Sequence, residues 1–412
     1  MAMKSFFSQP WDIQWKTALV RLPRAVPRAV LSFTTPQGPQ PFTVDLKSRG
    51  KHKIPVWVWI AEDLTPAEAS CMPVIIDFHG GGFVLGSCLE QAPFCSKLAR
   101  ELRGVVLSVD YRMGPIDKFP AAVEDAEDVL YAVLDPERAG YDKLRRHIRQ
   151  RIHENWSAAR AQKAAARAQR AAAWDPNSPI PMSRTPSPLP VIDTVNLDTT
   201  RIALSGFSSG GNLALNLALS IPVSAAPDGT ETKAWPSPFP ASYSFPISLL
   251  LFYPSFDARQ LPSERTRPAN FPLPNGFWHE LNDTLTPTYL PRDQAAHPRA
   301  SPGLNNVREC LHPAARMFLI LPELDSLAHQ SEIWVKKVED EGRAEDLRVE
   351  RFKGMKHGWT QMPDGWLTET EKQYKDETYD EAVSFTKGIW EGKRDVLETT
   401  RPFVAGVDGV FM

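Results

Sequence analysis

Short apolar runs alternate along this chain with segments whose apolar residues repeat at helical spacing. The apolar runs predict strands, at 55–60, 73–78, 104–111, 201–207, 247–254, 315–323 and 347–352. The helical spacing predicts helices, at 121–134, 210–221 and 331–342. The run "PVIIDF" at 73–78 is continuously apolar, as in a strand that is buried on both faces. The alternation predicts an α/β fold: a mostly parallel sheet with helices on both faces.

One of these predicted helices also shows which of its faces should be buried. In 331–342, Ile333, Trp334 and Val338 are expected to share one apolar face, and Gly342 to end the helix. Ligands of such parallel sheets bind beyond the carboxyl ends of the strands, so that edge is where a site is expected.

Two segments interrupt the alternation of strands and helices. Residues 138–195 contain the basic, alanine-rich run "RAQKAAARAQRAAAW" at 160–174, which favours a helix, and a Pro-rich stretch at 175–191, which predicts a mobile loop. Residues 223–246 are a second Pro-rich excursion. For the basic helix, a solvated face beside the core is the simpler interpretation, and an acidic partner is the alternative.

Composition narrows the classes of protein. The 412 residues are 42% hydrophobic and 23% charged, and the net charge of −2 gives no reason to expect nucleic acid as a partner. The 4 cysteines lack metal-ligand or redox spacing and are too sparse to cross-link the chain, which favours a reducing, cytoplasmic location. We find no secretory signal pattern at the N-terminus and no apolar run of transmembrane length.

The N-terminal segment has two interpretations. Residues 15–33 mix apolar and basic residues, which would suit peripheral contact with a membrane surface. Two prolines interrupt the stretch, and this favours a cap segment that covers an apolar pocket. We therefore predict an N-terminal cap segment at 1–50, a core at 51–137 and 196–400, and an insertion at 138–195 that forms part of the cap or a mobile loop.

A candidate nucleophile lies between a predicted strand and a predicted helix. The segment "GFSSGG" at 206–211 contains G-x-S-x-G, and a sharp strand-to-helix turn there would lift Ser208 above the edge of the sheet. Gly206 and Gly210 leave room for such a turn. Any G-x-S-x-G can arise by chance, and the strand–turn–helix context is what makes it informative.

A serine hydroxyl needs a base, which should be a histidine oriented by a carboxylate later in the chain. Asp325 and His357 each follow a predicted strand, which places them at the same edge of the sheet as Ser208. Other histidines and acids remain as alternatives, namely His297, His312 and His329, and Glu323 and Asp257. Only His357 follows a strand in a Gly-flanked loop, "GMKHGW".

The glycine-rich segment "HGGGFVLGS" at 79–87 follows the buried strand at 73–78. Attack on an ester carbonyl creates an oxyanion, which backbone N–H groups without neighbouring side chains can approach. We expect the N–H groups of Gly81, Gly82 and Ser209 to form this oxyanion hole, and His79 and Gly80 to support the loop. The spacing lacks G-x-G-x-x-G, so a dinucleotide site is not indicated.

Taken together, the motifs resemble the hormone-sensitive-lipase-like branch of the α/β-hydrolase family. The matching segments are "HGGGFVLGS", "VDYRMGPIDKFPAAVEDAEDVL", "GFSSGGNLAL", "YPSFD", "HPRASP", "LPELDSLAHQSE" and "GMKHGW". The resemblance implies an eight-stranded sheet with a helical cap, and ester hydrolysis without metal or cofactor. It also implies the triad Ser208, Asp325 and His357, and the Pro-rich insertions look like those of fungal members.

The sequence departs from the family pattern beside the nucleophile. The family usually has G-D-S-A-G or G-T-S-A-G, whereas Phe207 and Ser209 stand at the variable positions here. Ser209 still has a backbone N–H, so the expected oxyanion hole is retained. Phe207 introduces an aromatic ring next to the nucleophile, and the insertion at 138–195 has no clear counterpart in the family.

The sequence thus predicts a serine carboxylic ester hydrolase that cleaves small to medium hydrophobic esters through an acyl-enzyme. The alternative is a biosynthetic enzyme of the same fold that performs acyl transfer, cyclisation or elimination on a secondary metabolite. A non-catalytic small-molecule receptor is disfavoured, because receptors of this family lose the histidine base and His357 is present. The expected partner is a small-molecule ester.

Overall fold

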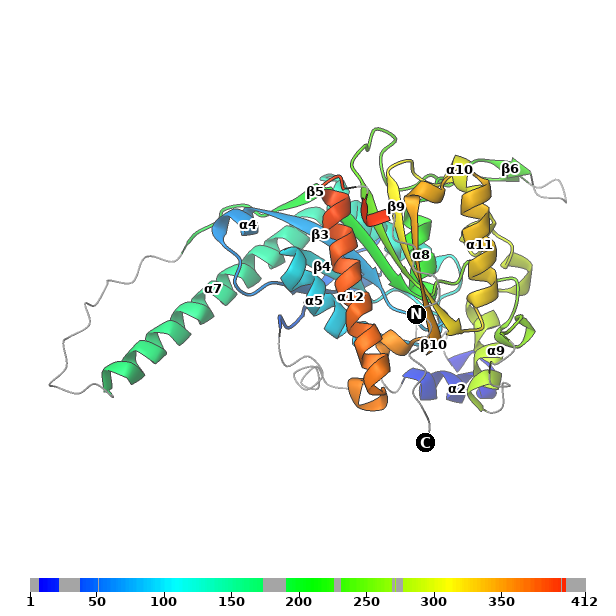
Figure 1. The fold of residues 1–412 in the computed structure, drawn as a ribbon, viewed down its shortest axis with the longest axis horizontal. Helices are drawn as coiled ribbons and strands as arrows, with labels where there is room; N and C mark the ends of the chain where they lie inside the picture. The colour runs from blue at the N-terminus through cyan, green and yellow to red at the C-terminus, as the bar shows by residue number, and fades with distance from the viewer. Residues whose placement is uncertain are drawn as a thin grey trace.

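The computed structural model describes residues 7–21, 38–50, 52–172, 190–225, 231–268, 271, 277–393 and 395–397. Eight strands form the main sheet in the order β1-β2-β4-β3-β5-β8-β9-β10 (Figure 1). Their bounds are β1 Phe42–Lys47, β2 Lys53–Ile60, β3 Cys71–Phe78, β4 Val105–Val109, β5 Asn196–Phe207, β8 Ile247–Phe252, β9 Ala315–Leu324 and β10 Leu347–Lys356.

The sheet is mostly parallel, as the sequence predicted. β1 pairs antiparallel with β2, and β2 pairs antiparallel with β4. From β4 through to β10 every neighbouring pair is parallel. The parallel strands β3, β4 and β8 are buried along nearly their whole length, which explains why their sequences are continuous apolar runs rather than alternating ones.

Helices cover both faces of the sheet. One face carries α5 (Ala92–Leu102) and α12 (Glu369–Trp390), and the other carries α6 (Ala121–Leu134), α8 (Ser209–Leu217) and α11 (Ala328–Asp340). The other helices and strands in the described residues are α2 (Trp11–Arg21), α4 (Pro66–Ser70), α7 (Tyr141–Ala172), α9 (Phe277–Tyr289), α10 (Val307–Cys310), β6 (Ser224–Ala225) and β7 (Glu231–Thr232). Short 3₁₀ turns lie at Pro262–Glu264, Arg292–Gln294, Pro302–Leu304, Ala344–Asp346, Trp359–Gln361, Asp364–Trp366 and Asp395–Leu397.

The buried face of α11 differs from the prediction. Trp334 and Val338 are buried as expected, but Ile333 is 58% exposed and Val335 takes its place in the core. The helix begins at Ala328, and the buried row follows 331, 334, 335 and 338. Spacing of three and four residues from Ser331 therefore describes this face, and Ile333 lies on the solvent side.

The boundaries of the predicted cap and insertion also need correction. β1 lies within the predicted N-terminal cap segment, yet it is the edge strand of the main sheet. In the insertion, the first half of α7 packs on β1 and α6, with Leu144, Ile148 and Ile152 fully buried. This half is a core helix, because its apolar residues recur every four positions and face the sheet.

Other expectations for these segments fall partly outside the described residues. Most of the segment 15–33 does so, as does most of the Pro-rich stretch 175–191. Among the helices that are described, none combines the length and hydropathy needed to cross a membrane.

Candidate active site

Ser208 occupies a sharp turn between the end of β5 and the start of α8. Its backbone has a φ of +53°, a conformation that a non-glycine residue adopts only when the surrounding structure enforces it. The Ser208 N–H donates to the carbonyl of Phe252 at 2.9 Å, and its own carbonyl accepts from the N–H of Ser255 at 3.1 Å. These bonds hold the turn against the end of β8 and direct the side chain away from the sheet.

The two glycines of G-x-S-x-G are required by close approaches of the backbone. A Cβ on Gly206 would lie 2.1 Å from the carbonyl oxygen of Gly210, and a Cβ on Gly210 would lie 2.0 Å from that of Phe78. Neither contact leaves room for a side chain, so the motif at this position reflects the geometry of the turn.

The structure brings Ser208, His357 and Asp325 together. Nε2 of His357 lies 3.0 Å from the hydroxyl oxygen of Ser208, and Nδ1 lies 2.6 Å from Oδ2 of Asp325. The other carboxylate oxygen of Asp325 accepts the N–H of Leu327 at 2.7 Å. Because both Asp325 oxygens are acceptors, Nδ1 of His357 carries the proton and Nε2 is free to accept one from Ser208.

The alternative acids and bases are engaged elsewhere. Oε2 of Glu323 accepts the N–H of Gly354 at 2.8 Å, and Asp257 pairs with Arg259 at 2.7 Å. Burial raises the pKa of Asp257, but hydrogen bonds and charge from Arg259 outweigh it and lower the pKa overall. Each alternative histidine also lies apart from Ser208: His297 and His312 accept nearby backbone N–H groups, and His329 is exposed on α11.

The glycine loop after β3 lies beside Ser208. A Cβ built on Gly80 would come 3.4 Å from the Cβ of Ser208. Gly81 and Gly82 have φ values of +118° and +60°, so the loop needs glycine conformations. The N–H groups of Gly81, Gly82 and Ser209 donate to no group in the described part of the chain, which leaves them available to an oxyanion.

His79 is buried behind this loop and does not contact His357. Its Nδ1 donates to the carbonyl of Gly80 at 2.7 Å, and its ring stacks on that of Tyr111 at 4.3 Å. The Tyr111 hydroxyl in turn donates to the carbonyl of His79 at 2.6 Å. These contacts join His79 to the loop and to Tyr111.

Tyr253 is a site residue that the sequence analysis did not single out. It follows β8 with a φ of +37°, and its ring meets the His357 ring edge-on at 4.9 Å. Its hydroxyl lies 2.6 Å from Oγ1 of Thr360, in the loop that carries His357. The segment "YPSFD" was noted as a family match, but nothing in one sequence indicates that its tyrosine packs against the base.

Phe207 does not face the nucleophile. Its ring is fully buried and stacks on Phe252 at 4.2 Å, with Phe94 of α5 edge-on at 5.4 Å. Successive residues of a strand point to opposite faces, so Phe207 fills the core on the α5 and α12 side. Phe207, which replaces the usual family residue, therefore changes how the core is packed beneath the turn.

Two helices adjoin the glycine loop. The ring of Tyr289, at the end of α9, stacks on Phe83 of the loop at 4.7 Å. Arg21, at the end of α2, donates to the carbonyl of Gly114 at 2.8 Å, and the N–H of Gly114 donates to the carbonyl of Phe83. Besides α8, which begins at Ser209, the helices α2 and α9 thus lie near the glycine loop, whereas α7 lies along β1 at the edge of the sheet.

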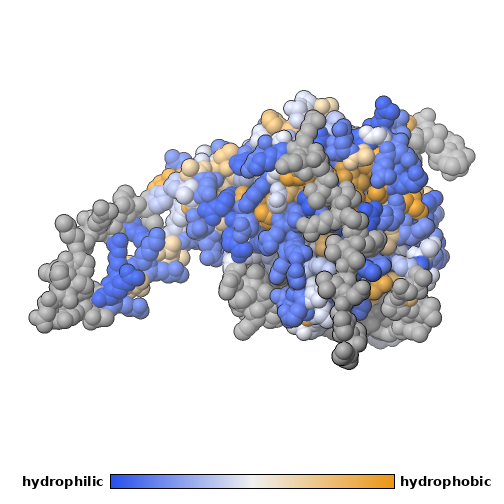
Figure 2. Space-filling model, in the orientation of Figure 1, coloured by the Kyte–Doolittle hydropathy of each residue, from blue (hydrophilic) through white to orange (hydrophobic). Residues whose placement is uncertain are grey.

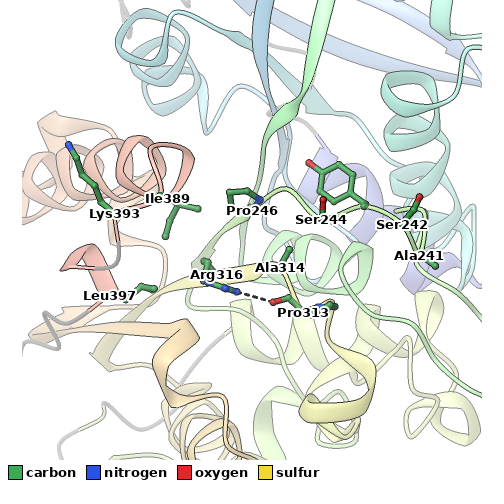
Figure 3. A pocket seen from close by; sticks show the side chains of 12 residues that line it. Ala241, Ser242, Ser244, Pro246, Pro313, Ala314, Arg316, Ile389, Lys393 and Leu397 are labelled. Carbon is green, nitrogen blue, oxygen red and sulfur yellow. Dashed lines mark hydrogen bonds between the residues drawn. The ribbon is translucent and has the colours of Figure 1, made fainter.

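A separate cavity of about 630 Å³ lies at the opposite end of the strands (Figure 3). Pro246, Ala314 and Arg316 line it where β8 and β9 begin, together with Ile389 and Leu397. Asp325 follows the other end of β9, about 30 Å away by the rise of a strand. This cavity is therefore distinct from the candidate active site. Among the described residues, no three His, Cys, Asp or Glu side chains are grouped so that they could hold a metal ion.

A serine, a histidine and an aspartate in contact above a parallel sheet, with a glycine loop beside the serine, match the arrangement of serine hydrolases. The family described as alpha/beta hydrolase fold matches residues 75–361. This chain belongs to that family.

Several of the similar proteins carry esterase names. The chain is 43% identical over 76 residues to "Probable carboxylesterase 8" of Arabidopsis thaliana. This alignment covers 18% of this chain and 22% of that protein. It is 44% identical over 78 residues to "3-O-acetylpapaveroxine carboxylesterase CXE2" of Papaver somniferum, with 17% and 25% covered. The matched segments thus span about a quarter of these relatives or less.

Among solved structures, a hyperthermophilic esterase from the archaeon Pyrobaculum calidifontis superimposes with a TM-score of 0.57. The alignment covers 91% of this chain and 98% of that chain at 21% identity. At this identity the likeness concerns the fold, and it extends over nearly the whole length of the esterase.

Proposed function

We propose that this protein is a serine carboxylic ester hydrolase of the hormone-sensitive-lipase-like branch, with Ser208, His357 and Asp325 as its triad. The observation that carries the proposal is the pair of short contacts made by His357, at 3.0 Å to Ser208 and 2.6 Å to Asp325. The carboxylesterase names of the relatives support the reaction class.

The proposed reaction follows from these contacts. Oγ of Ser208 attacks the ester carbonyl carbon while Nε2 of His357 takes the hydroxyl proton. Asp325 holds the ring in the tautomer with Nδ1 protonated and stabilises the imidazolium that forms. His357 then gives the proton to the leaving alkoxide, and a water molecule activated in the same way releases the acid from the acyl-enzyme. These steps need neither metal nor cofactor.

We assign the oxyanion hole to the N–H groups of Gly81, Gly82 and Ser209, with His79 and Gly80 supporting the loop. Their unengaged N–H groups and the closeness of Gly80 to Ser208 support this assignment. We further propose that α2 and α9 form the cap over the acyl or alcohol group. The rings of Phe83 and Tyr289 beside the loop favour hydrophobic esters of small to medium size.

The cellular setting is also a proposal. All four cysteines are free thiols, three of them buried, which supports a reducing, cytoplasmic location. A fungal source remains a prediction from the Pro-rich insertions. No particular feature favours acyl transfer, cyclisation or elimination over hydrolysis.

The direct test is Ser208→Ala assayed with short-chain p-nitrophenyl esters, and labelling of the wild type with a fluorophosphonate probe. We expect hydrolysis to fall by several orders of magnitude and labelling to disappear, with an unchanged circular dichroism spectrum. Ser384→Ala, which alters an exposed serine on α12, is the matched control. Full turnover by Ser208→Ala would remove this residue from the reaction.

A further inference from the structure

Helix α7 has two unlike halves. Its first half is anchored in the core by a row of apolar side chains, Leu144, Ile148, Ile152 and Trp156. The indole of Trp156 also donates to the carbonyl of Leu64 at 2.8 Å. From residue 157 to residue 170 nearly every residue is exposed, and the helix projects past the sheet as an arm (Figure 1).

The arm carries four cations and no acid. Arg160, Lys163, Arg167 and Arg170 follow one another at spacings of three, four and three residues. At 100° per residue they fall within an arc of about 80° and extend over about 15 Å. None of the four makes a hydrogen bond or ion pair with any described residue. We call these four residues the basic stripe.

The basic stripe faces the side of α7 on which the body of the protein lies. It continues the row formed by Ile152 and Trp156, because Arg160 is four residues beyond Trp156. The stripe therefore borders the angle between the arm and the body, and Figure 2 shows the arm standing clear of the body along its outer part. A ligand of these cations has to fit inside that angle.

We propose that the basic stripe binds an acidic segment of another polypeptide, which lies along α7 in this angle. Seven alanines in 157–170 leave little bulk around the four cations, so a peptide backbone can approach closely. Carboxylates spaced at three and four residues on a helix, or along an extended chain, match the spacing of the stripe. The interaction is electrostatic and weakens as salt is added.

Other polyanions fit this geometry less well. A flat bilayer would meet the body before it reached a stripe that faces the same side, and 157–172 has no large apolar residue to insert. The whole chain carries −2 and the stripe +4, so the rest carries −6 and repels a large polyanion such as duplex DNA. A second copy of this chain would bring a stripe that is also positively charged, and the two stripes would repel each other.

The test uses the full chain and a fluorescent peptide of about twelve glutamates, followed by anisotropy at low and at near-physiological ionic strength. One variant replaces Arg160, Lys163, Arg167 and Arg170 with alanine, which keeps a helix-forming sequence. A control variant removes four exposed cations elsewhere, through Lys53→Ala, Arg259→Ala, Lys336→Ala and Lys393→Ala. Circular dichroism checks that α7 stays helical in both.

We expect the stripe variant to lose at least about tenfold in affinity, the effect of four exposed ion pairs, and the control variant to stay near the wild type. Added salt should weaken binding of the peptide by the wild type more than binding by the stripe variant. Absence of binding by the wild type at low salt would overturn the proposal, as would equal losses in both variants. Tighter stripe-dependent binding to phosphatidylserine vesicles or duplex DNA, or stripe-dependent self-association in sedimentation, would replace the acidic polypeptide with that partner.

Discussion

The proposed role of Asp325 is best tested by Asp325→Asn, which keeps the shape of the side chain and changes one atom. Oδ1 of Asp325 accepts the N–H of Leu327 at 2.7 Å, so an asparagine that keeps this bond must turn its amide nitrogen toward Nδ1 of His357. An NH₂ group cannot accept a hydrogen bond, so Nδ1 has to lose its proton. The ring proton then moves to Nε2, which donates toward Ser208 and no longer acts as a base.

The expected loss is large because the base is removed while the contacts are kept. Loss of the correct histidine tautomer in a serine triad costs about ten-thousandfold in kcat, equivalent to about 5 kcal/mol of barrier. The assay is steady-state hydrolysis of p-nitrophenyl butyrate at neutral pH, together with the rate of fluorophosphonate labelling. Both should fall together, because both require an activated Ser208.

The two other candidate acids provide the comparison. Glu323→Gln and Asp257→Asn should each change kcat by less than about tenfold, since neither carboxylate contacts His357. The reasoning is refuted if Asp325→Asn hydrolyses the ester within tenfold of the wild type while folded, or if Asp257→Asn shows the larger loss.

Three further predictions concern the loop, a buried carboxyl group and α7. In Gly81→Ala the new Cβ would lie 2.0 Å from the carbonyl oxygen of Leu85 at a φ of +118°, so kcat should fall by about a hundredfold or more with little change in circular dichroism. Burial raises the pKa of Asp77 to about 6, above its unfolded value, so its ionisation destabilises the fold as the pH rises through 6. Urea unfolding should therefore show Asp77→Asn gaining about 2 kcal/mol relative to the wild type between about pH 4.5 and pH 8, and a constant difference would contradict the burial argument. Ile148→Ala should cost about 3 kcal/mol in urea unfolding, whereas a loss below about 1 kcal/mol would mean that this half of α7 is not part of the core.

The sequence was most informative where the backbone itself dictates residue type. The buried parallel strands have no polar face, so they appear as uninterrupted apolar runs such as 73–78. The contacts of Gly206 and Gly210 leave no room for a Cβ, so these glycines mark the turn at Ser208. The order of strand ends along the chain then indicated which of several histidines and acids would meet there.

The features that were missed depend on contacts between distant segments. β1 is short and half exposed, so its pattern carries little signal, and only pairing with β2 makes it part of the sheet. The first half of α7 is rich in Arg and His, which hid a buried row that includes Leu144 and Ile148. The packing of Tyr253 on His357 joins residues about a hundred positions apart, and no local pattern records it.

The turn at Ser208 also bears on how this protein could be altered. The hydrogen bonds that fix the turn come from main-chain atoms of Phe252 and Ser255, and the tight approaches involve only main-chain atoms. The side chain of the proposed nucleophile can therefore be changed separately from the backbone that holds it. Ser208→Cys would therefore change the attacking atom and leave the backbone of the turn unaltered. Replacing Gly206 or Gly210 even with alanine would instead disrupt the turn, because neither position has room for a Cβ.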